Sequence, residues 1–314
     1  MPATFVAGDW GTTHLRLFLC DAAGHVLDSA SGPGAAQARG QHAAVLDALI
    51  EPWQRDHGSL PVILCGMVGS SFGWAQAPYV PCPVRPAQIA AACIELLAGR
   101  VHIVPGLSCR NPFNAPDLMR GEETQILGAL SLEPRLQRGR HMLCLPGTHT
   151  KWVTLEDGAV STFMTSPTGE LYALLCEHSV LVSDQEAPAR DESIEAFERG
   201  LLEFNRFPQA QLLHRLFEIR SRRLAGELPV AGVAAYLSGL LIGSDVHGAL
   251  QTLSPVASEE PVHLIGASPL TAFYAAALAR QERRLQRLEG TEASLAGLIH
   301  VQRQLTQRFS ACAH

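Results

Sequence analysis

The stretch Thr4-Phe5-Val6-Ala7-Gly8-Asp9-Trp10-Gly11-Thr12-Thr13-His14-Leu15-Arg16 decides the fold expected for this chain. Its apolar start, Phe5–Ala7, favours a buried strand. The alternating run Leu15–Cys20 then predicts a second strand. The polar residues between the two runs therefore form the bend of a β-hairpin.

The bend of this hairpin carries residue types that suit a phosphate and its metal. Gly11 lets a ligand approach the backbone closely, while Thr12 and Thr13 supply N–H and O–H donors. Asp9 can hold Mg²⁺ directly or through water, and it is also a candidate catalytic residue. An ordinary hairpin turn fits the same residues, so this stretch alone leaves both interpretations open.

A similar pattern recurs in the second half of the chain. The apolar run 142–145 is followed by the polar turn 146–150, an alternating strand over 151–156 and a third strand over 159–164. The repeat predicts a duplicated domain with two phosphate-binding hairpins facing each other across a cleft. Leu145 stands where the first copy has Asp9, so the two loops should play different parts.

The second hairpin supplies further candidates for cofactor binding: Gly147, Thr148, His149 and Lys151. Lys151 is the only lysine in a chain otherwise rich in arginine, which hints that a compact ammonium matters there.

A buried strand over 261–265 runs into Gly266-Ala267-Ser268, where Ser268 is expected to cap the following helix. A helix start at a glycine turn suits a nucleotide, so Gly266 and Ser268 are also cofactor-binding candidates. A plain strand–helix junction explains these residues equally well.

Composition bounds the class of protein. The 314 residues, 47% of them hydrophobic, can build a large core, and two domains are expected. A net charge of −6 gives no basis for nucleic-acid binding. The eight cysteines form no Cys-x-x-Cys pair, which favours buried thiols in a reducing cytoplasm. No signal peptide or membrane span is recognised, and a homodimer is left open.

The order of elements predicts an α/β fold. Three strands in a meander are followed by helices over 41–57 and 86–98, each leading to a buried strand, as in a ribonuclease-H-like domain. We therefore expect duplicated ribonuclease-H-like domains around a central cleft. The expected lobes are 1–118 and 119–314, and the second carries a helical insertion at about 180–250.

Gly69-Ser70-Ser71-Phe72-Gly73 matches the nucleophile elbow of hydrolases, but the elbow needs a helix that begins at its serine. Gly73 and Pro78 follow too soon for a stable helix, which argues against hydrolase chemistry. Residues 66–71 are better interpreted as a wall of a binding site, whose backbone amides and hydroxyls contact a polar ligand.

The charged stretch 117–125 precedes an apolar helix expected over 126–132. Glu122 or Glu123 could act as the general base that accepts a hydroxyl proton, with Asp117 in reserve, and Arg120 could clamp an anionic group. Alternatively, the two glutamates simply favour a helix N-terminus. Their position between two phosphate hairpins favours the catalytic interpretation.

Several blocks of the sequence resemble the 2-dehydro-3-deoxygalactonokinase family of the sugar-kinase/Hsp70/actin superfamily. The hairpin Asp9–Thr13 and the second hairpin Pro146–His149 are shared across the superfamily. The specific blocks are Gly66-Met67-Val68-Gly69-Ser70 with Gly73-Trp74 and Ala77-Pro78-Tyr79, and Met119-Arg120-Gly121-Glu122-Glu123-Thr124-Gln125. Further matches are Val104–Leu107, Lys151–Val153, Thr168–Leu171 and Leu237–Gly243.

The resemblance implies transfer of the ATP γ-phosphate to the 6-hydroxyl of 2-dehydro-3-deoxy-D-galactonate, with Mg²⁺, in galactonate catabolism. It also implies an actin/hexokinase-like arrangement, with the sugar-acid site in the lobe 1–118 and the nucleotide site in the lobe 119–314. The sugar acid is then expected among Met67, Gly69, Ser70, Trp74, Tyr79 and Arg120. The chain departs from the family pattern at Ser166-Pro167 and at Gly290-Thr291-Glu292, where the family often has Gly-Asp.

Three alternatives remain open at this point. One is a phosphatase or exopolyphosphatase of the same fold, and another is a kinase of a related 2-keto-3-deoxy sugar acid. The third is a nucleotide-dependent switch with negligible turnover.

Overall fold

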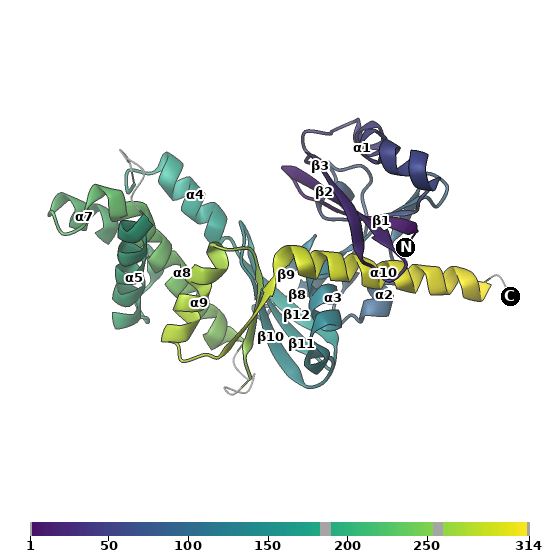
Figure 1. Ribbon diagram of the computed structural model, residues 1–314. Coiled ribbons are helices and arrows are strands. Elements are labelled where there is room, and N and C mark those ends of the chain that lie inside the picture. The colour runs from purple at the N-terminus through teal and green to yellow at the C-terminus, as the bar shows by residue number, and fades with distance from the viewer. Residues whose placement is uncertain (1, 183–189, 254–259, 313–314) are drawn as a thin grey trace. The chain divides into compact units, whose positions relative to one another are not determined.

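The first sheet is built on the expected hairpin. The computed structural model (Figure 1) describes residues 2–182, 190–253 and 260–312. The sheet contains β1 (Ala3–Trp10), β2 (His14–Asp21), β3 (Val26–Pro33), β4 (Val62–Cys65), β6 (Ile94–Leu96) and β7 (Val101–Ile103), in the order β3-β2-β1-β4-β7-β6. β1 is antiparallel to β2 and parallel to β4, and β4 is parallel to β7. The carboxyl ends of β1, β4 and β7 therefore meet at one edge.

The second sheet repeats this arrangement. It contains β10 (Arg140–Leu145), β11 (Thr150–Glu156), β12 (Ala159–Ser166), β13 (Val262–Gly266) and β14 (Leu285–Glu289), in the order β12-β11-β10-β13-β14. As in the first sheet, a three-strand meander places its first strand innermost, and that strand is parallel to the next one added. The expected duplication is confirmed at the level of sheet topology.

The helices follow the sheets along the chain. They are α1 (His42–His57), α2 (Pro86–Ala91), α3 (Glu122–Leu132), α4 (Thr168–His178), α5 (Arg190–Arg206), α6 (Leu212–Leu216), α7 (Glu218–Leu224), α8 (Val233–Thr252), α9 (Leu270–Arg280) and α10 (Gly290–Cys312). Single 3₁₀ turns lie at η1 (Met67–Gly69), η2 (Pro134–Gln137) and η3 (Val230–Gly232). A small third sheet joins β5 (Tyr79–Pro81), β8 (Gly106–Arg110) and β9 (Pro116–Met119).

The prediction of a helix over 86–98 is wrong for the second half of this segment. It ends at Ala91, and Ile94–Leu96 instead forms the edge strand β6, paired antiparallel with β7. Strand pairing therefore overrides the helical pattern of this short segment. Within the expected helical insertion, residues 212–224 form two short helices, α6 and α7.

Compactness divides the chain into two units whose bounds differ from the expected boundary at residue 118. Unit 1 comprises Met1–Arg140, Val153–Phe163 and Leu288–His314. Unit 2 comprises His141–Trp152 and Met164–Arg287. The largest difference is α10, which lies within the expected lobe 119–314 but packs along α3 and against α2 and β1 in unit 1 (Figure 1).

Two glycines allow α3 and α10 to pack closely. A Cβ at Gly128 of α3 would collide with the carbonyl oxygen of Ala293, and a Cβ at Gly297 of α10 would collide with the carbonyl oxygen of Thr124. Both obstacles are backbone atoms, which cannot rotate away. The contact between these helices therefore depends on glycine at both positions.

Replacement of Gly128 tests this packing. We expect Gly128→Ala to lower the free energy of unfolding by about 1–3 kcal/mol, because the added methyl forces the two helices apart. The matched control is Gly248→Ala in α8, where no atom lies near an added Cβ and alanine favours the helix. Urea unfolding of both variants measures the difference, and equal midpoints would contradict the close packing.

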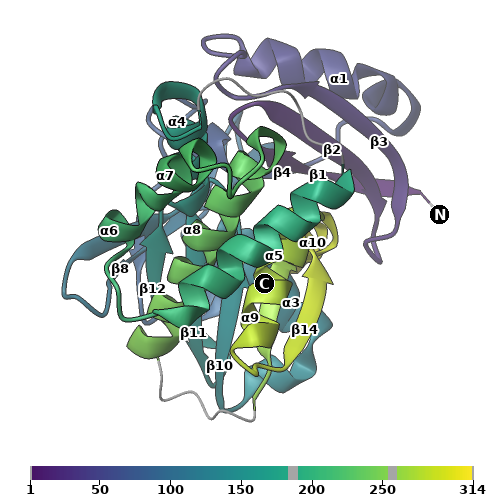
Figure 2. The same cartoon turned by 90° about the vertical axis from the view of Figure 1, so that its left-hand side faces the viewer.

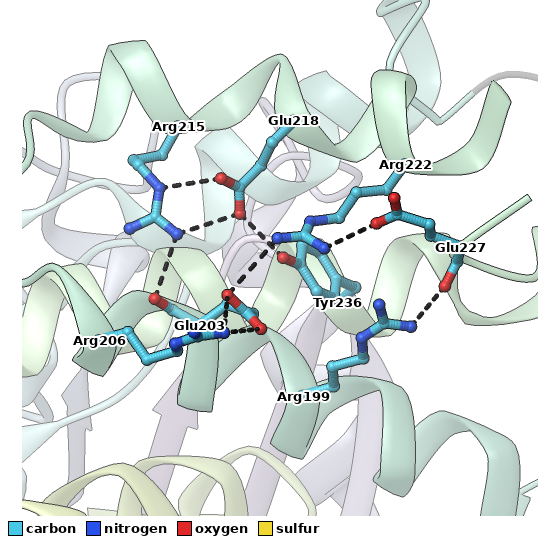
Figure 3. Close-up of polar contacts among 8 residues, drawn as sticks. All are labelled: Arg199, Glu203, Arg206, Arg215, Glu218, Arg222, Glu227 and Tyr236. Atoms are coloured by element: carbon cyan, nitrogen blue, oxygen red, sulfur yellow. Dashed lines mark hydrogen bonds and ion pairs between the residues drawn. The ribbon is translucent and has the colours of Figure 1, made fainter. Parts of the chain in front are cut away.

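The helices inserted in the second half form a layer of their own in unit 2. α5 lies alongside α8 (Figure 2), and the side chains of α6, α7 and α8 share a buried cluster with Phe204 of α5. A polar network of arginines and glutamates joins them (Figure 3). In it Arg215 donates two hydrogen bonds to Glu218, at 2.9 and 3.1 Å, and the hydroxyl of Tyr236 donates to Glu218 at 2.8 Å.

The expectation that no stretch approaches a membrane span is wrong for one segment. Val230–Thr252 is long and apolar enough to cross a membrane by length and composition. Most of its apolar window is buried inside the protein, as in the core helix of a globular domain. Its hydrophobicity is thus accounted for by packing within unit 2.

Candidate active site

The first hairpin turn is held by the segment that follows β3. The amide of Gly11 donates to the carbonyl of His14, and the amides of Ala35 and Ala36 donate to the carbonyls of Gly11 and Thr12. A Cβ at Gly11 would meet one atom at 3.5 Å, an ordinary contact. The fold itself therefore does not require glycine here, which leaves room for a ligand close to the backbone.

Asp9 lies at the carboxyl end of β1, directly beside Cys65 at the end of β4. Burial raises the pKa of Asp9 above its ordinary value. The thiol of Cys65 donates a hydrogen bond to it and nearby Arg16 lowers the pKa, whereas the Glu122 carboxylate raises it further. Two carboxylates that repel each other in a half-buried setting are stabilised by a divalent cation.

The residues around Asp9 fit Mg²⁺ that is also bound by substrate phosphates and water. Among the described residues, no three His, Cys, Asp or Glu side chains gather as a metal site. Mg²⁺, however, is commonly held by one or two carboxylates together with substrate phosphates and water. Asp9, with Glu122 nearby, meets that requirement.

Glu122 and Glu123 occupy the first turn of α3, which begins four residues earlier than expected. Glu123 is fully buried, and the two oxygens of its carboxyl group accept hydrogen bonds from the amide of Gly121, at 2.6 Å, and from the hydroxyl of Thr124, at 3.1 Å. Glu122 is only half-buried. A substrate hydroxyl can therefore reach Glu122 far more readily than Glu123.

The buried glutamate makes a prediction about pH. Burial raises the pKa of Glu123 to about 8, and the charge of Glu122 adds to this rise. The ordinary pKa of a glutamate is about 4.3, so between these values the folded protein keeps a proton that the unfolded chain has released. The free energy of unfolding should therefore fall as the pH rises through this window.

Glu123→Gln removes this titration. Urea midpoints measured across the same pH window should fall less steeply for Glu123→Gln than for the unsubstituted protein. Equal slopes for the two proteins would show that Glu123 is not protonated in the folded state.

Three of the residues expected to bind the sugar acid lie together in unit 1. The guanidinium of Arg120 stacks 4.4 Å from the ring centre of Tyr79. Arg120 also packs against Gly69, where an added Cβ would lie 2.8 Å from the Nη1 atom of Arg120. Its Nη2 donates to the carbonyl of Ala77 at 2.8 Å. Nε and Nη1 are buried without a hydrogen-bond partner among the described residues, so an anion would satisfy them.

The other expected sugar-acid residues belong to the turn around η1. The hydroxyl of Ser70 donates to the carbonyl of Met67 at 2.7 Å, so it already serves its own turn. Trp74 and Met67 are partly buried against the core of unit 1. No helix begins at Ser70, which confirms that the hydrolase elbow is absent.

The reserve candidate Asp117 lies in β9, opposite Cys109 of β8. Its carboxylate accepts hydrogen bonds from the amide of Leu118, at 2.9 Å, and from the side-chain amide of Asn111, at 3.4 Å. These bonds tie Asp117 to the small sheet.

The second hairpin lies in unit 2 and is held by the start of α4. The amide of Glu170 donates to the carbonyl of Thr148 at 3.0 Å, and His149 contacts the Glu170 carboxylate at 2.9 Å. A Cβ at Gly147 would meet nothing closer than 4.0 Å, so this position is more open than that of Gly11 in the first hairpin, where the nearest atom lies at 3.5 Å. Lys151 is buried in β11, where its Nζ donates to the carbonyl of His149 at 3.3 Å.

A cavity of about 590 Å³ opens in unit 2 beside this hairpin, within the range of small-molecule sites. Its walls are mainly apolar, with a few hydroxyls and one carboxylate. The lining residues are Gly147, Thr168, Gly169, Tyr172, Ala173, Cys176, Glu177, Phe197, Ala234, Ala235, Ser238, Leu241, Ile242, Leu270, Phe273 and Tyr274. This cavity could not be predicted from the sequence, because its walls come from four separate helices.

Gly266 and Ser268 do not line this cavity, although α9, which follows them, does. Ser268 is not the helix cap that was expected. α9 begins at Leu270, with Pro269 in the capping position and no side-chain cap. The first turn is closed by backbone bonds to Ala267 and Pro269 instead.

At one of the two departures from the family pattern, the residue present makes a hydrogen bond of its own. The hydroxyl of Thr291 accepts a hydrogen bond from Arg16 at 3.2 Å, so Thr291 makes a polar contact at the start of α10. The other, Pro167, precedes α4, and its carbonyl accepts the amide of Leu171.

The duplicated sheets, each begun by a glycine hairpin, define an actin-like α/β fold. The solved activator of the 2-hydroxyisocaproyl-CoA dehydratase from Clostridium difficile has the same fold, with a TM-score of 0.53 at 10% identity, covering 98% of this chain and 97% of the other. A Sinorhizobium meliloti crystal structure, provisionally named a 2-dehydro-3-deoxygalactonokinase, is much more similar. Its TM-score is 0.86 at 33% identity, covering 96% of this chain and 99% of the other.

Sequence comparison identifies the family. The model of the 2-keto-3-deoxy-galactonokinase family matches residues 9–301. The 2-dehydro-3-deoxygalactonokinase of Escherichia coli (strain K12) is 35% identical over 95% of this chain and 97% of its own length. A protein of Rhizobium meliloti (strain 1021), named a probable 2-dehydro-3-deoxygalactonokinase, is 36% identical over 94% and 95%. The chain belongs to the 2-keto-3-deoxy-galactonokinase family.

Proposed function

We propose that this protein transfers the γ-phosphate of ATP to the 6-hydroxyl of 2-dehydro-3-deoxy-D-galactonate in galactonate catabolism. The family match over residues 9–301 is the observation that carries this proposal. A kinase of this family uses ATP, and the chain offers two open glycine hairpins that suit phosphates. The relatives are metabolic kinases, and we place the activity in the cytoplasm; a homodimer stays a prediction.

Unit 1 is assigned the sugar acid and the proton transfer. Arg120, two of whose buried donor atoms find no partner in the part of the chain that the structure describes, would take the carboxylate of the sugar acid, bordered by Tyr79 and Gly69. Glu122, half-buried beside Asp9, would accept the proton of the 6-hydroxyl. Glu123, buried and hydrogen-bonded on both oxygens, would hold the start of α3 in place.

Asp9 is the residue assigned to Mg²⁺, with the turn Gly11–Thr13 donating to the terminal phosphates. When bound, the ion would offset the negative charge of the phosphates. The chain's own contribution is to hold the Asp9 carboxylate, which the neighbouring Cys65 and the strand pairing of β1 with β4 keep in place.

Unit 2 is assigned the nucleotide. The cavity beside Gly147 has flat apolar walls from Tyr172 and Phe273, which suit a purine, and polar groups at Thr168 and Ser238. Gly147 has free space where a Cβ would lie, so the phosphates could approach the backbone of the second hairpin there.

One coupled assay tests the proposed function. ADP formation from ATP and Mg²⁺ is followed across a panel of 2-keto-3-deoxy sugar acids. We expect rapid ADP formation with 2-dehydro-3-deoxy-D-galactonate and little without a sugar acid. A higher rate with another member of the panel would reassign the substrate, and equal ATP hydrolysis with and without sugar acid would contradict a kinase.

A further inference from the structure

A single carboxylate joins four elements of unit 2. Asp245, on α8, accepts a hydrogen bond on Oδ1 from the indole N–H of Trp152 in β11, at 2.9 Å. Its Oδ2 accepts two more, from the hydroxyl of Thr168 at the start of α4, at 2.8 Å, and from the hydroxyl of Tyr274 in α9, at 2.6 Å. The carboxylate therefore links β11, α4 and α9 to its own helix.

The directions of these hydrogen bonds follow from the chemistry of the donors. Indole N–H can only donate, and the one proton of Tyr274 faces Asp245. The hydroxyl of Thr150, 2.8 Å from the Tyr274 oxygen, must then donate to that oxygen. All three groups on Asp245 are neutral donors to a charged acceptor, which makes the hydrogen bonds strong.

The network borders the cavity assigned to the nucleotide. Thr168 and Tyr274 both line that cavity. The residue after Thr168 packs directly on the second hairpin, because a Cβ at Gly169 would lie 2.5 Å from the carbonyl oxygen of Gly147. Any shift of Thr168 would therefore move the hairpin as well as the cavity wall.

We propose that Asp245 is a positioning residue for the nucleoside triphosphate, holding Thr168, Tyr274 and the second hairpin in the arrangement that binds it. This inference rests on the proposed nucleotide site. In the first hairpin the carboxylate is Asp9, at the end of the strand itself. The second hairpin has Leu145 at that position, and Asp245 of α8 acts on this hairpin only through its hydrogen bond to Thr168.

The test is the substitution Asp245→Asn, which keeps the size of the side chain but removes its charge and places N–H groups where donors already point. We expect the KM for ATP to rise about tenfold or more, as for the loss of hydrogen bonds to a charged group. The KM for the sugar acid should stay within about twofold, because its residues lie in unit 1.

Three further substitutions separate positioning from folding. Tyr274→Phe and Thr168→Val each remove one donor and should also raise the KM for ATP. Thr168→Ser keeps the hydroxyl, so its KM for ATP should stay close to that of the unsubstituted protein. If Asp245→Asn does not fold, Tyr274→Phe and the Thr168 pair carry the test. An unchanged KM for ATP in Tyr274→Phe and Thr168→Val would overturn the proposal.

Glu218→Gln is the matched control. Glu218 also accepts a hydrogen bond from a buried tyrosine of unit 2, but neither Glu218 nor Tyr236 lines the cavity. We expect this variant to lower Tm without changing the KM for ATP. If Asp245→Asn behaves in the same way, Asp245 is only a structural residue and the proposal is wrong.

A cavity-filling variant distinguishes this inference from the assignment beneath it. Ala235→Trp fills the cavity, and Gln251→Trp adds the same side chain at an exposed position of the same helix. A KM for ATP unchanged by Ala235→Trp would contradict the nucleotide site itself. A KM raised by Ala235→Trp but not by the Asp245, Tyr274 and Thr168 variants would overturn only the role of Asp245.

Discussion

Glu122→Gln should lower kcat by about 10²–10⁴, the usual contribution of a general base. Glutamine keeps the shape of the side chain but cannot accept the proton of the 6-hydroxyl. Glu122 is the one of the two adjacent glutamates that is only half-buried, and its charge is felt by Asp9. The KM values for ATP and the sugar acid should change little, because the interaction is made in the transition state.

The control for this substitution is Glu133→Gln, at the other end of the same helix. It should keep kcat close to that of the unsubstituted protein. If Glu122→Gln also keeps kcat within a few-fold, Glu122 is not the base. The same measurement on Glu123→Gln and Asp117→Asn would then show whether either of the other two candidate carboxylates performs the proton transfer.

The second large effect is expected at Asp9. Asp9→Asn removes the negative charge from the residue assigned to Mg²⁺, so a higher metal concentration should be needed to reach half-maximal activity. Loss of a partner outside the first ligand shell already costs about 10–100-fold in metal affinity. Loss of a ligand should shift the Mg²⁺ titration at least as far.

Asp28→Asn is a suitable control for the Asp9 variant. Asp28 lies in β3 of the same sheet, where its carboxylate accepts a hydrogen bond from the indole of Trp53. It should leave the Mg²⁺ titration unchanged. If the Mg²⁺ titrations of Asp9→Asn and of the unsubstituted protein are superimposable, Asp9 is not a ligand of the metal.

The two hairpins were predictable from the sequence because each combines a local strand pattern with a polar glycine turn. The first hairpin is predicted by its own residues around Asp9–Thr13, and the prediction of the second is supported by its similarity to the first. Their order within the sheets is the same in both copies. Local signals of this kind need no knowledge of distant contacts.

Features that depend on distant contacts could not be found in the same way. The position of α10 in unit 1 depends on Gly128 and Gly297, which look like ordinary helical glycines in the sequence. Asp245 lies 77 residues from Thr168 and 29 from Tyr274, so nothing local marks it as their partner. The choice between Glu122 and Glu123 also needed the burial of each side chain, which sequence spacing leaves open.

The most direct test of the proposed function identifies the reaction product. The protein is incubated with ATP, Mg²⁺ and 2-dehydro-3-deoxy-D-galactonate, and phosphorus and carbon NMR follow the phosphate. We predict one sugar phosphate for each ADP formed, with the phosphate on the oxygen of carbon 6. Inorganic phosphate released from ATP while the sugar acid stays unmodified would contradict the proposal and indicate a hydrolase instead.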